Sequence, residues 1–258
     1  GRAMGLKETI EKFSDPYERK ARLWPALLTL LPALVLVSTL YAPFVSLAAN
    51  AVSLAVSCGA LYLFANIARE YGKRLEPKLF ESWGGIPSTQ ILRHRNDHFG
   101  TAIKANLHSF LASKLGAAFP DAAGEAANPA QADDVYRSAV TWLLSQTRNT
   151  KTFDMLYREN ISYGFRRNAL GLKPLGILVA IGSIVWVLVM HGVLVISTNN
   201  PSWGSEKLAA LPPGAWLTIG VSGLQMVAWL FFFTRITVRT AAFAYADTLI
   251  KSCNQLQH

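Results

Sequence analysis

The sequence predicts an all-α membrane protein: four transmembrane helices, with a helical cytoplasmic domain inserted between spans two and three. Composition gives the first reason. Of 258 residues, 51% are hydrophobic and only 16% are charged, whereas an average soluble domain carries about 25% charged residues. The second reason is that Lys, Arg, Asp and Glu are all absent from the ranges 23–68, 174–205 and 208–234. Each range exceeds the roughly 20 apolar residues that cross a bilayer.

The first uncharged run is too long for a single crossing and is interrupted at Tyr41-Ala42-Pro43. We therefore expect span one at 23–41 and span two at 44–67, which form a transmembrane hairpin over 23–67. Span three is expected at 175–196, with Pro174 in its first turn, where a missing N–H costs little. Span four is expected at 215–233, after a pair of prolines. The second hairpin then covers 175–234.

Basic residues near the spans predict the orientation. They lie before span one, on both sides of the central segment and after span four, whereas the two hairpin connections carry almost none. Because cytoplasmic loops carry an excess of Lys and Arg, the segments 1–22, 68–174 and 235–258 are all expected inside the cell. Both termini are then cytoplasmic. The chain is expected to be a multi-pass protein of a bacterial inner membrane.

The central segment is expected to be helical. Span two should continue past the membrane to about Phe80, and the glycine pair and proline in 82–87 should end it. A short helix capped by Ser88 or Thr89 would hold Ile91 and Leu92. A helix over 100–115 would place an apolar face inward, made of Ile103, Leu107, Phe110 and Leu111. We expect a mobile loop over 116–131, helices over 133–146 and 152–169 with Gly171 as a C-cap, and an amphipathic helix over 235–256.

Several basic and aromatic residues of the central segment are candidates for binding a phosphate-bearing ligand. The cluster Arg93-His94-Arg95 follows a Gly-Gly turn, at which a ligand can approach the backbone closely. Trp83 offers a stacking surface of the kind that single-stranded nucleic acid uses. For the basic residues just before span three, attraction to anionic lipid headgroups is an alternative. The predicted ligand-binding set is Trp83, Arg93, His94, Arg95, Lys104, Arg166 and Arg167.

Uncharged polar residues form stripes inside two of the expected spans. In span two, the stripe is Ser46, Asn50, Ser53 and Ser57, at spacings that place all four on one helical face. Thr218, Ser222, Gln225 and Trp229 repeat this spacing in span four. Such a stripe either packs against a neighbouring helix or lines a water-filled path. The span-two residues are the candidate pore lining.

The motifs of common catalytic sites are absent from the sequence, which has no GxSxG, P-loop, GxGxxG or HExxH. We therefore expect no enzyme activity and no cofactor. Cys58 and Cys253 form no CxxC motif and suggest neither a disulfide nor a zinc site. His94 and His98 have a spacing that a metal could use on a helix, but a polar or anion-facing surface is the commoner outcome, and no metal is expected.

The chain resembles the four-pass ion-channel effectors of the Hailong system of bacterial antiphage defence. The residues that carry the resemblance are Trp83-Gly84-Gly85-Ile86-Pro87, then 93–97, and 158–160 through Arg166-Arg167 before span three. The resemblance implies a homotetrameric channel that is held closed by single-stranded DNA, or a related nucleotide, made by a partner nucleotidyltransferase. Opening would depolarise the membrane. The alternative is a non-conducting membrane scaffold or transporter subunit whose central segment docks a partner.

Overall fold

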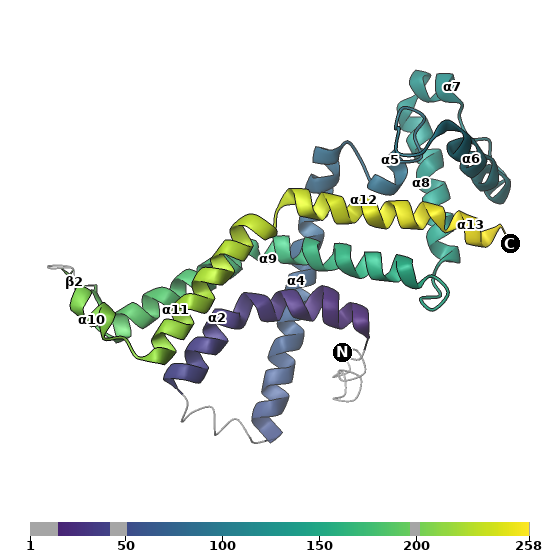
Figure 1. Cartoon of the computed structure of the whole chain (residues 1–258). Coiled ribbons are helices and arrows are strands. Elements are labelled where there is room, and N and C mark those ends of the chain that lie inside the picture. The colour runs from purple at the N-terminus through teal and green to yellow at the C-terminus, as the bar shows by residue number, and fades with distance from the viewer. Residues whose placement is uncertain (1–14, 42–50, 197–201, 258) are drawn as a thin grey trace. The chain divides into compact units, whose positions relative to one another are not determined.

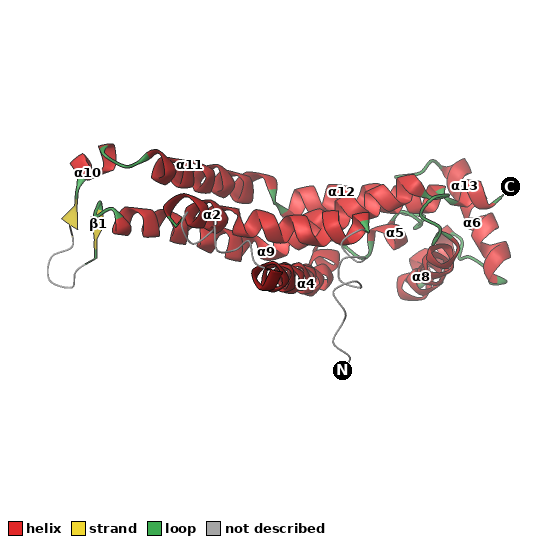
Figure 2. Cartoon of the chain, turned by 90° about the horizontal axis from the view of Figure 1, so that it is seen from below, coloured by secondary structure: helices red, strands yellow, loops and turns green. Residues whose placement is uncertain are grey.

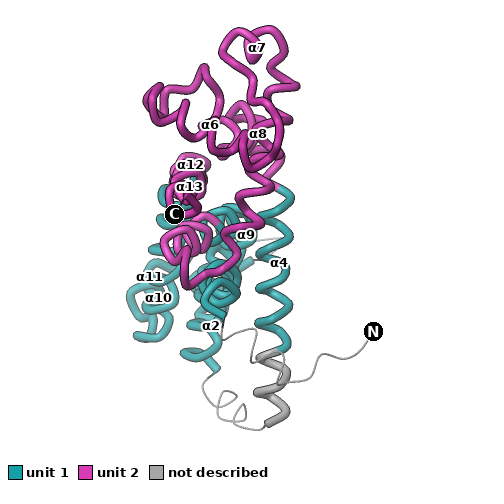
Figure 3. The backbone as a smooth tube through the Cα atoms, turned by 90° about the vertical axis from the view of Figure 1, so that its right-hand side faces the viewer, with its two compact units in different colours: residues 1–74, 164–234 teal, residues 75–163, 235–258 magenta. Residues whose placement is uncertain are grey.

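A computed structural model describes residues 15–41, 51–196 and 202–257 of the chain, which are mainly helical (Figures 1 and 2). The chain divides into two compact units, which Figure 3 colours separately. Unit 1 comprises 1–74 and 164–234, and unit 2 comprises 75–163 and 235–258. Two long helices, α4 (Ala51–Trp83) and α9 (Asp154–Met190), contain residues of both units. The prediction of an almost entirely helical protein is confirmed.

Unit 1 contains the apolar helices. Within it, η1 (Glu18–Leu23) is a π-helix that leads into α2 (Trp24–Leu40), and α11 (Pro213–Val227) continues into a second π-helix, η3 (Ala228–Phe232). A short hairpin pairs β1 (Leu194–Val195) with β2 (Ser202–Trp203), and α10 (Ser205–Ala209) follows it. Helices α2 and α11 pack against each other along their lengths.

Three helices of the described residues are long and apolar enough to cross a membrane: Glu18–Leu40, Asp154–Met190 and Pro213–Phe232. They contain most of predicted spans one, three and four, so three of the four expected spans are supported by length and composition. Predicted span two begins at residue 44, and residues 42–50 lie outside the described part of the chain. Span two therefore stays a prediction.

Helix α9 corrects two expectations about the start of span three. It runs without a break through Gly171 and Pro174, so Gly171 is not a C-cap and Pro174 is not in a first turn. Gly171 has a packing role instead, because a Cβ there would lie 2.7 Å from the backbone nitrogen of Gly72 in α4. The helix also ends at Met190, whereas span three was predicted to end at Ile196. The chain turns just after Met190, where Gly192 has a left-handed φ of 65°.

Unit 2 is a helical domain with its own apolar core. Its helices besides the ends of α4 and α9 are α5 (Pro87–Gln90), α6 (Thr101–Leu115), α7 (Ala122–Ala127), α8 (Pro129–Gln146), α12 (Arg235–Lys251) and α13 (Cys253–Leu256). The core is built from 91–156 together with 246–253. Leu107 and Leu111 are buried in it as predicted, whereas Ile103 is 56% exposed. The C-terminal helix thus shares one core with the central segment.

The expectation of a mobile loop over 116–131 was wrong, because this segment holds helix α7 and the start of α8. Asp121 caps α7 by accepting a hydrogen bond from the backbone N–H of Gly124. Asn128 caps α8 in the same way, from the N–H of Gln131. Both side chains satisfy N–H groups that a helix start leaves without intrahelical partners. An Ala-rich composition between two such caps favours a helix.

Candidate functional site

The structure brings Arg93, His94, Arg95 and Lys104 together in unit 2 as one group, here called the 93–104 cluster. The Arg93 guanidinium is engaged with a carboxylate: Nε donates to Asp133 Oδ1 at 2.8 Å and Nη2 to Oδ2 at 2.6 Å. Its Nη1 donates to the carbonyl of Gly84 at 2.9 Å. Such a two-pronged pair is strong and geometrically specific. Arg93 therefore joins the Gly-Gly turn to helix α8, and its guanidinium is engaged inside unit 2.

The Gly84-Gly85 turn does permit a close approach, as the sequence predicted, but the approaching group is internal. Both glycines have positive φ, 85° and 129°. A Cβ on Gly85 would lie 2.8 Å from Nη2 of Arg93. Because Gly85 has no side chain, the space beside it is occupied by the Arg93 guanidinium and not by an external ligand.

Glu125, which the sequence analysis did not single out, organises the middle of the cluster. Its carboxylate accepts hydrogen bonds from the backbone N–H of His94 at 2.7 Å, from that of Arg95 at 3.3 Å, and from the Tyr136 hydroxyl at 2.7 Å. The Glu125 side chain is only 3% exposed. Burial acts to raise its pKa, but these hydrogen bonds and the nearby Arg95 charge outweigh burial and lower it.

The two histidines with metal-compatible spacing are each engaged elsewhere. His94 Nε2 lies 2.9 Å from the carbonyl oxygen of Pro120, and His98 Nε2 lies 2.8 Å from Asp247 Oδ1. The neighbouring His108 bonds the Leu92 carbonyl at 2.7 Å, and burial lowers its pKa. Within the described residues, no three His, Cys, Asp or Glu side chains are grouped so as to hold a metal ion.

The remaining predicted ligand residues differ in their surroundings. Lys104 is buried, and its ammonium donates to the carbonyls of His94 and Asn96. Trp83 packs its ring against Phe80, with centroids 5.9 Å apart. The Arg95 side chain pairs with Glu125 at 3.5 Å but is 48% exposed. Within the cluster, Arg95 is thus the cation best placed to meet an external anion.

Arg166 and Arg167 belong to unit 1, whereas the other predicted ligand residues belong to unit 2. Arg167 is buried, and its guanidinium donates to the Oδ1 of Asn168 at 3.1 and 3.2 Å. Asn168 in turn donates to the carbonyl of Ala21 at 2.7 Å. Asn168 therefore joins α9 to η1, and Arg167 holds the Asn168 side chain in place.

The polar stripe of span four packs within the chain. Thr218, Ser222, Gln225 and Trp229 are all buried. Gln225 donates to the carbonyl of Leu28 in α2 at 2.6 Å, and the hydroxyls of Thr218 and Thr39 are 3.3 Å apart. This stripe therefore joins α11 to α2. Of the candidate pore lining in span two, Ser46 and Asn50 lie outside the described residues and Ser53 and Ser57 lie in α4, so the pore assignment stays a prediction.

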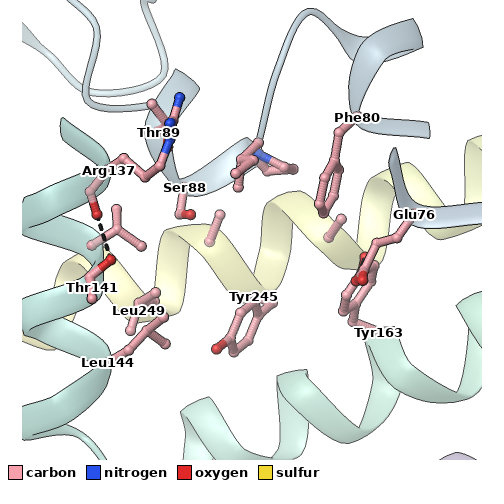
Figure 4. A pocket seen from close by; sticks show the side chains of 15 residues that line it. Glu76, Phe80, Ser88, Thr89, Arg137, Thr141, Leu144, Tyr163, Tyr245 and Leu249 are labelled. Carbon is pink, nitrogen blue, oxygen red and sulfur yellow. Dashed lines mark hydrogen bonds between the residues drawn. The ribbon is translucent and has the colours of Figure 1, made fainter. Parts of the chain in front are cut away.

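Unit 2 also contains a pocket of about 260 Å³ that sequence reasoning missed (Figure 4). Residues from five helical segments line it, including Phe80, Ser88, Thr89, Arg137, Tyr163 and Tyr245. The Tyr163 hydroxyl donates to Glu76 at 2.7 Å, and the Tyr163 and Tyr245 rings are stacked with centroids 6.4 Å apart. No local pattern could have revealed it, because its walls are far apart in the sequence.

Comparison with known proteins gives no relative for this chain: no protein-family model, no curated protein and no solved structure matches it.

Proposed function

We propose that this chain is a subunit of a ligand-gated, homo-oligomeric membrane channel. Unit 1 would form the conduction path and unit 2 would sense the ligand. On the resemblance stated above, the channel would be an antiphage effector of a bacterial inner membrane, would assemble as a tetramer, and would act by depolarisation. Both termini and unit 2 would face the cytoplasm.

The observation that carries the proposal is the exposed apolar surface of unit 1. In each of the three candidate spans, only 28% of the most apolar window is buried within the chain. The remaining surface needs lipid or other copies to cover it, since apolar patches of this extent are not left in water. In the described residues, the span-four stripe is buried inside the chain and lines no ion path. Several copies arranged around an axis could enclose such a path between them.

Helices α4 and α9 support a link between sensing and conduction. Each contains residues of unit 2 and of unit 1. A ligand that favours one conformation of unit 2 would bias the helices that continue into unit 1. This is a shift between two states by differential binding.

Ion flux into liposomes tests the channel. We expect the purified protein to dissipate an imposed membrane potential, to an extent that depends on the ligand. Asn50→Leu should remove most of this ion flux while the oligomer stays intact, because an apolar constriction dewets. Asn66→Leu is the matched control in the same predicted span, since the Asn66 amide is engaged with its own helix at the Tyr62 carbonyl. Absence of flux with and without candidate oligonucleotides would reject the channel proposal.

The two arginines of the cluster separate ligand binding from folding. If unit 2 binds single-stranded DNA or a nucleotide through its basic surface, Arg95→Ala should reduce the salt slope of binding by roughly one counterion. Arg93→Ala should instead loosen unit 2, because it leaves Asp133 without its partner. Arg148→Ala, at an exposed position of the same unit, is the control. An unchanged salt slope in Arg95→Ala would remove the 93–104 cluster from the ligand site.

The internal packing of the span-four stripe favours a second candidate, a non-conducting scaffold or transporter subunit. Thr218, Ser222 and the Gln225 amide nitrogen bond within the chain, as in helix association without a pore. Intact oligomers without flux, together with capture of a partner by unit 2, would support it.

A further inference from the structure

We propose that the pocket of unit 2 binds a small amphipathic organic anion, with an apolar body between its aromatic walls and an anionic head at Arg137. The inference concerns binding alone and stands whether or not the chain conducts ions. All residues that line the pocket belong to unit 2.

The walls select an apolar body. Aromatic side chains from three segments face the space, namely Phe80 from α4, Tyr163 from α9 and Tyr245 from α12 (Figure 4). The aliphatic residues Val140 and Leu249 also line the pocket. The volume of about 260 Å³ lies just below the roughly 300–1,000 Å³ of ligand sites for drug-sized molecules. A single ring or a short chain is therefore the appropriate size.

Two residues with hydroxyl groups, Ser88 and Thr89, line one end of the pocket. Thr89 is 3% exposed, and its Oγ1 is buried with no hydrogen-bond partner among the described residues. Ser88 is also buried, and Figure 4 shows its hydroxyl directed into the pocket. Because the Thr89 oxygen is enclosed by protein, the Ser88 hydroxyl is the group at this end that can donate a hydrogen bond to a ligand.

The charges favour an anion over a cation. In Figure 4, Arg137 and Glu76 lie at opposite sides of the pocket. Glu76 already accepts a hydrogen bond from Tyr163. The Arg137 side chain is 58% exposed, and its ion pair with Asp134 uses one nitrogen, Nη1, at 3.1 Å. A guanidinium has five donors in a planar fork, so Arg137 retains donors for a carboxylate at the end of the pocket that Ser88 lines.

Three compounds with one body and different heads test the proposal: 3-phenylpropanoate, 3-phenylpropanol and 3-phenylpropylamine. Saturation-transfer NMR with the full chain in lipid nanodiscs measures each affinity, and empty nanodiscs give the lipid background. We expect the carboxylate to bind on the order of tenfold more tightly than the alcohol, because a hydrogen bond to a charged group contributes about that factor in affinity. The amine should bind more weakly than both.

Two variants locate the binding. Arg137→Gln, at a surface position that should not disturb folding, should lower the affinity of the carboxylate to that of the alcohol, while the control Arg148→Gln leaves it unchanged. Ala242→Phe should fill the pocket and abolish binding of all three compounds, with thermal unfolding confirming that the protein is folded. Preference for the amine, equal binding of the three heads, an Arg137→Gln affinity equal to that of the parent, or no binding above the nanodisc background would each overturn the proposal.

Discussion

Replacing Glu125 with glutamine should destabilise unit 2 by about 3 kcal/mol, because a hydrogen bond to a buried charged group contributes roughly 1.5–3 kcal/mol. The carboxylate accepts three hydrogen bonds, two from backbone N–H groups and one from Tyr136. Glutamine has nearly the same volume, but its amide offers one acceptor oxygen and turns a donor toward other donors. The substitution therefore tests the charge and the hydrogen bonds and leaves packing almost unchanged.

The pH dependence of this variant has a defined sign. The pKa of Glu125 in the folded protein lies below its ordinary value of 4.5. Its contribution to stability is then complete above about pH 4.5 and is lost as the pH falls through the folded-state pKa. We expect the difference in unfolding free energy between parent and Glu125→Gln to be constant near neutral pH and to shrink in acid below pH 4.5.

Amide hydrogen exchange in the peptides of α7 and α8 measures the effect locally, which matters in a chain of two units. Glu81→Gln is the matched control, because Glu81 is an exposed residue of the same unit. Exchange in Glu125→Gln that is no faster than in Glu81→Gln would contradict the structural role assigned to Glu125.

Local sequence patterns predicted three helices that are long and apolar enough to cross a membrane, because a bilayer imposes a local requirement, a long uncharged run. The same patterns did not reveal the internal partners of the 93–104 cluster, because Asp133 and Glu125 are 40 and 30 residues away from Arg93 and Arg95 in the sequence. Glu125 lies in the segment 116–131, which the sequence predicted to be a loop. Nothing in that local sequence indicated that Glu125 would be buried and would accept hydrogen bonds from the cluster.

Tertiary packing also explains the other differences. Gly171 and Pro174 have the residue types that end or begin helices, yet both lie inside α9. A glycine that permits a close helix crossing cannot be told from a C-cap by local pattern. The pocket of unit 2 was likewise beyond prediction, since Phe80, Arg137 and Tyr245 come together only once α4, α8 and α12 have packed.

The crossing of α4 and α9 in unit 1 leads to the second large expected effect, for Gly171→Ala. A Cβ at Gly171 would lie 2.7 Å from the nitrogen of Gly72 and 2.7 Å from the carbonyl carbon of Tyr71. Both contacts are with backbone, so no side chain can rotate away and the helices must separate. Overpacking of this kind costs about 1–3 kcal/mol and occasionally more.

Gly182→Ala is the matched control for this variant, because it makes the same change in the same helix where nothing lies within 4 Å of the added Cβ. Alanine should be neutral or slightly stabilising there, since glycine inside a helix is disfavoured by roughly 0.5–1 kcal/mol. Thermal unfolding in mild detergent compares the two. Gly171→Ala should unfold several degrees below the parent and Gly182→Ala should not, whereas equal midpoints would mean that α4 and α9 do not cross closely at Gly72 and Gly171.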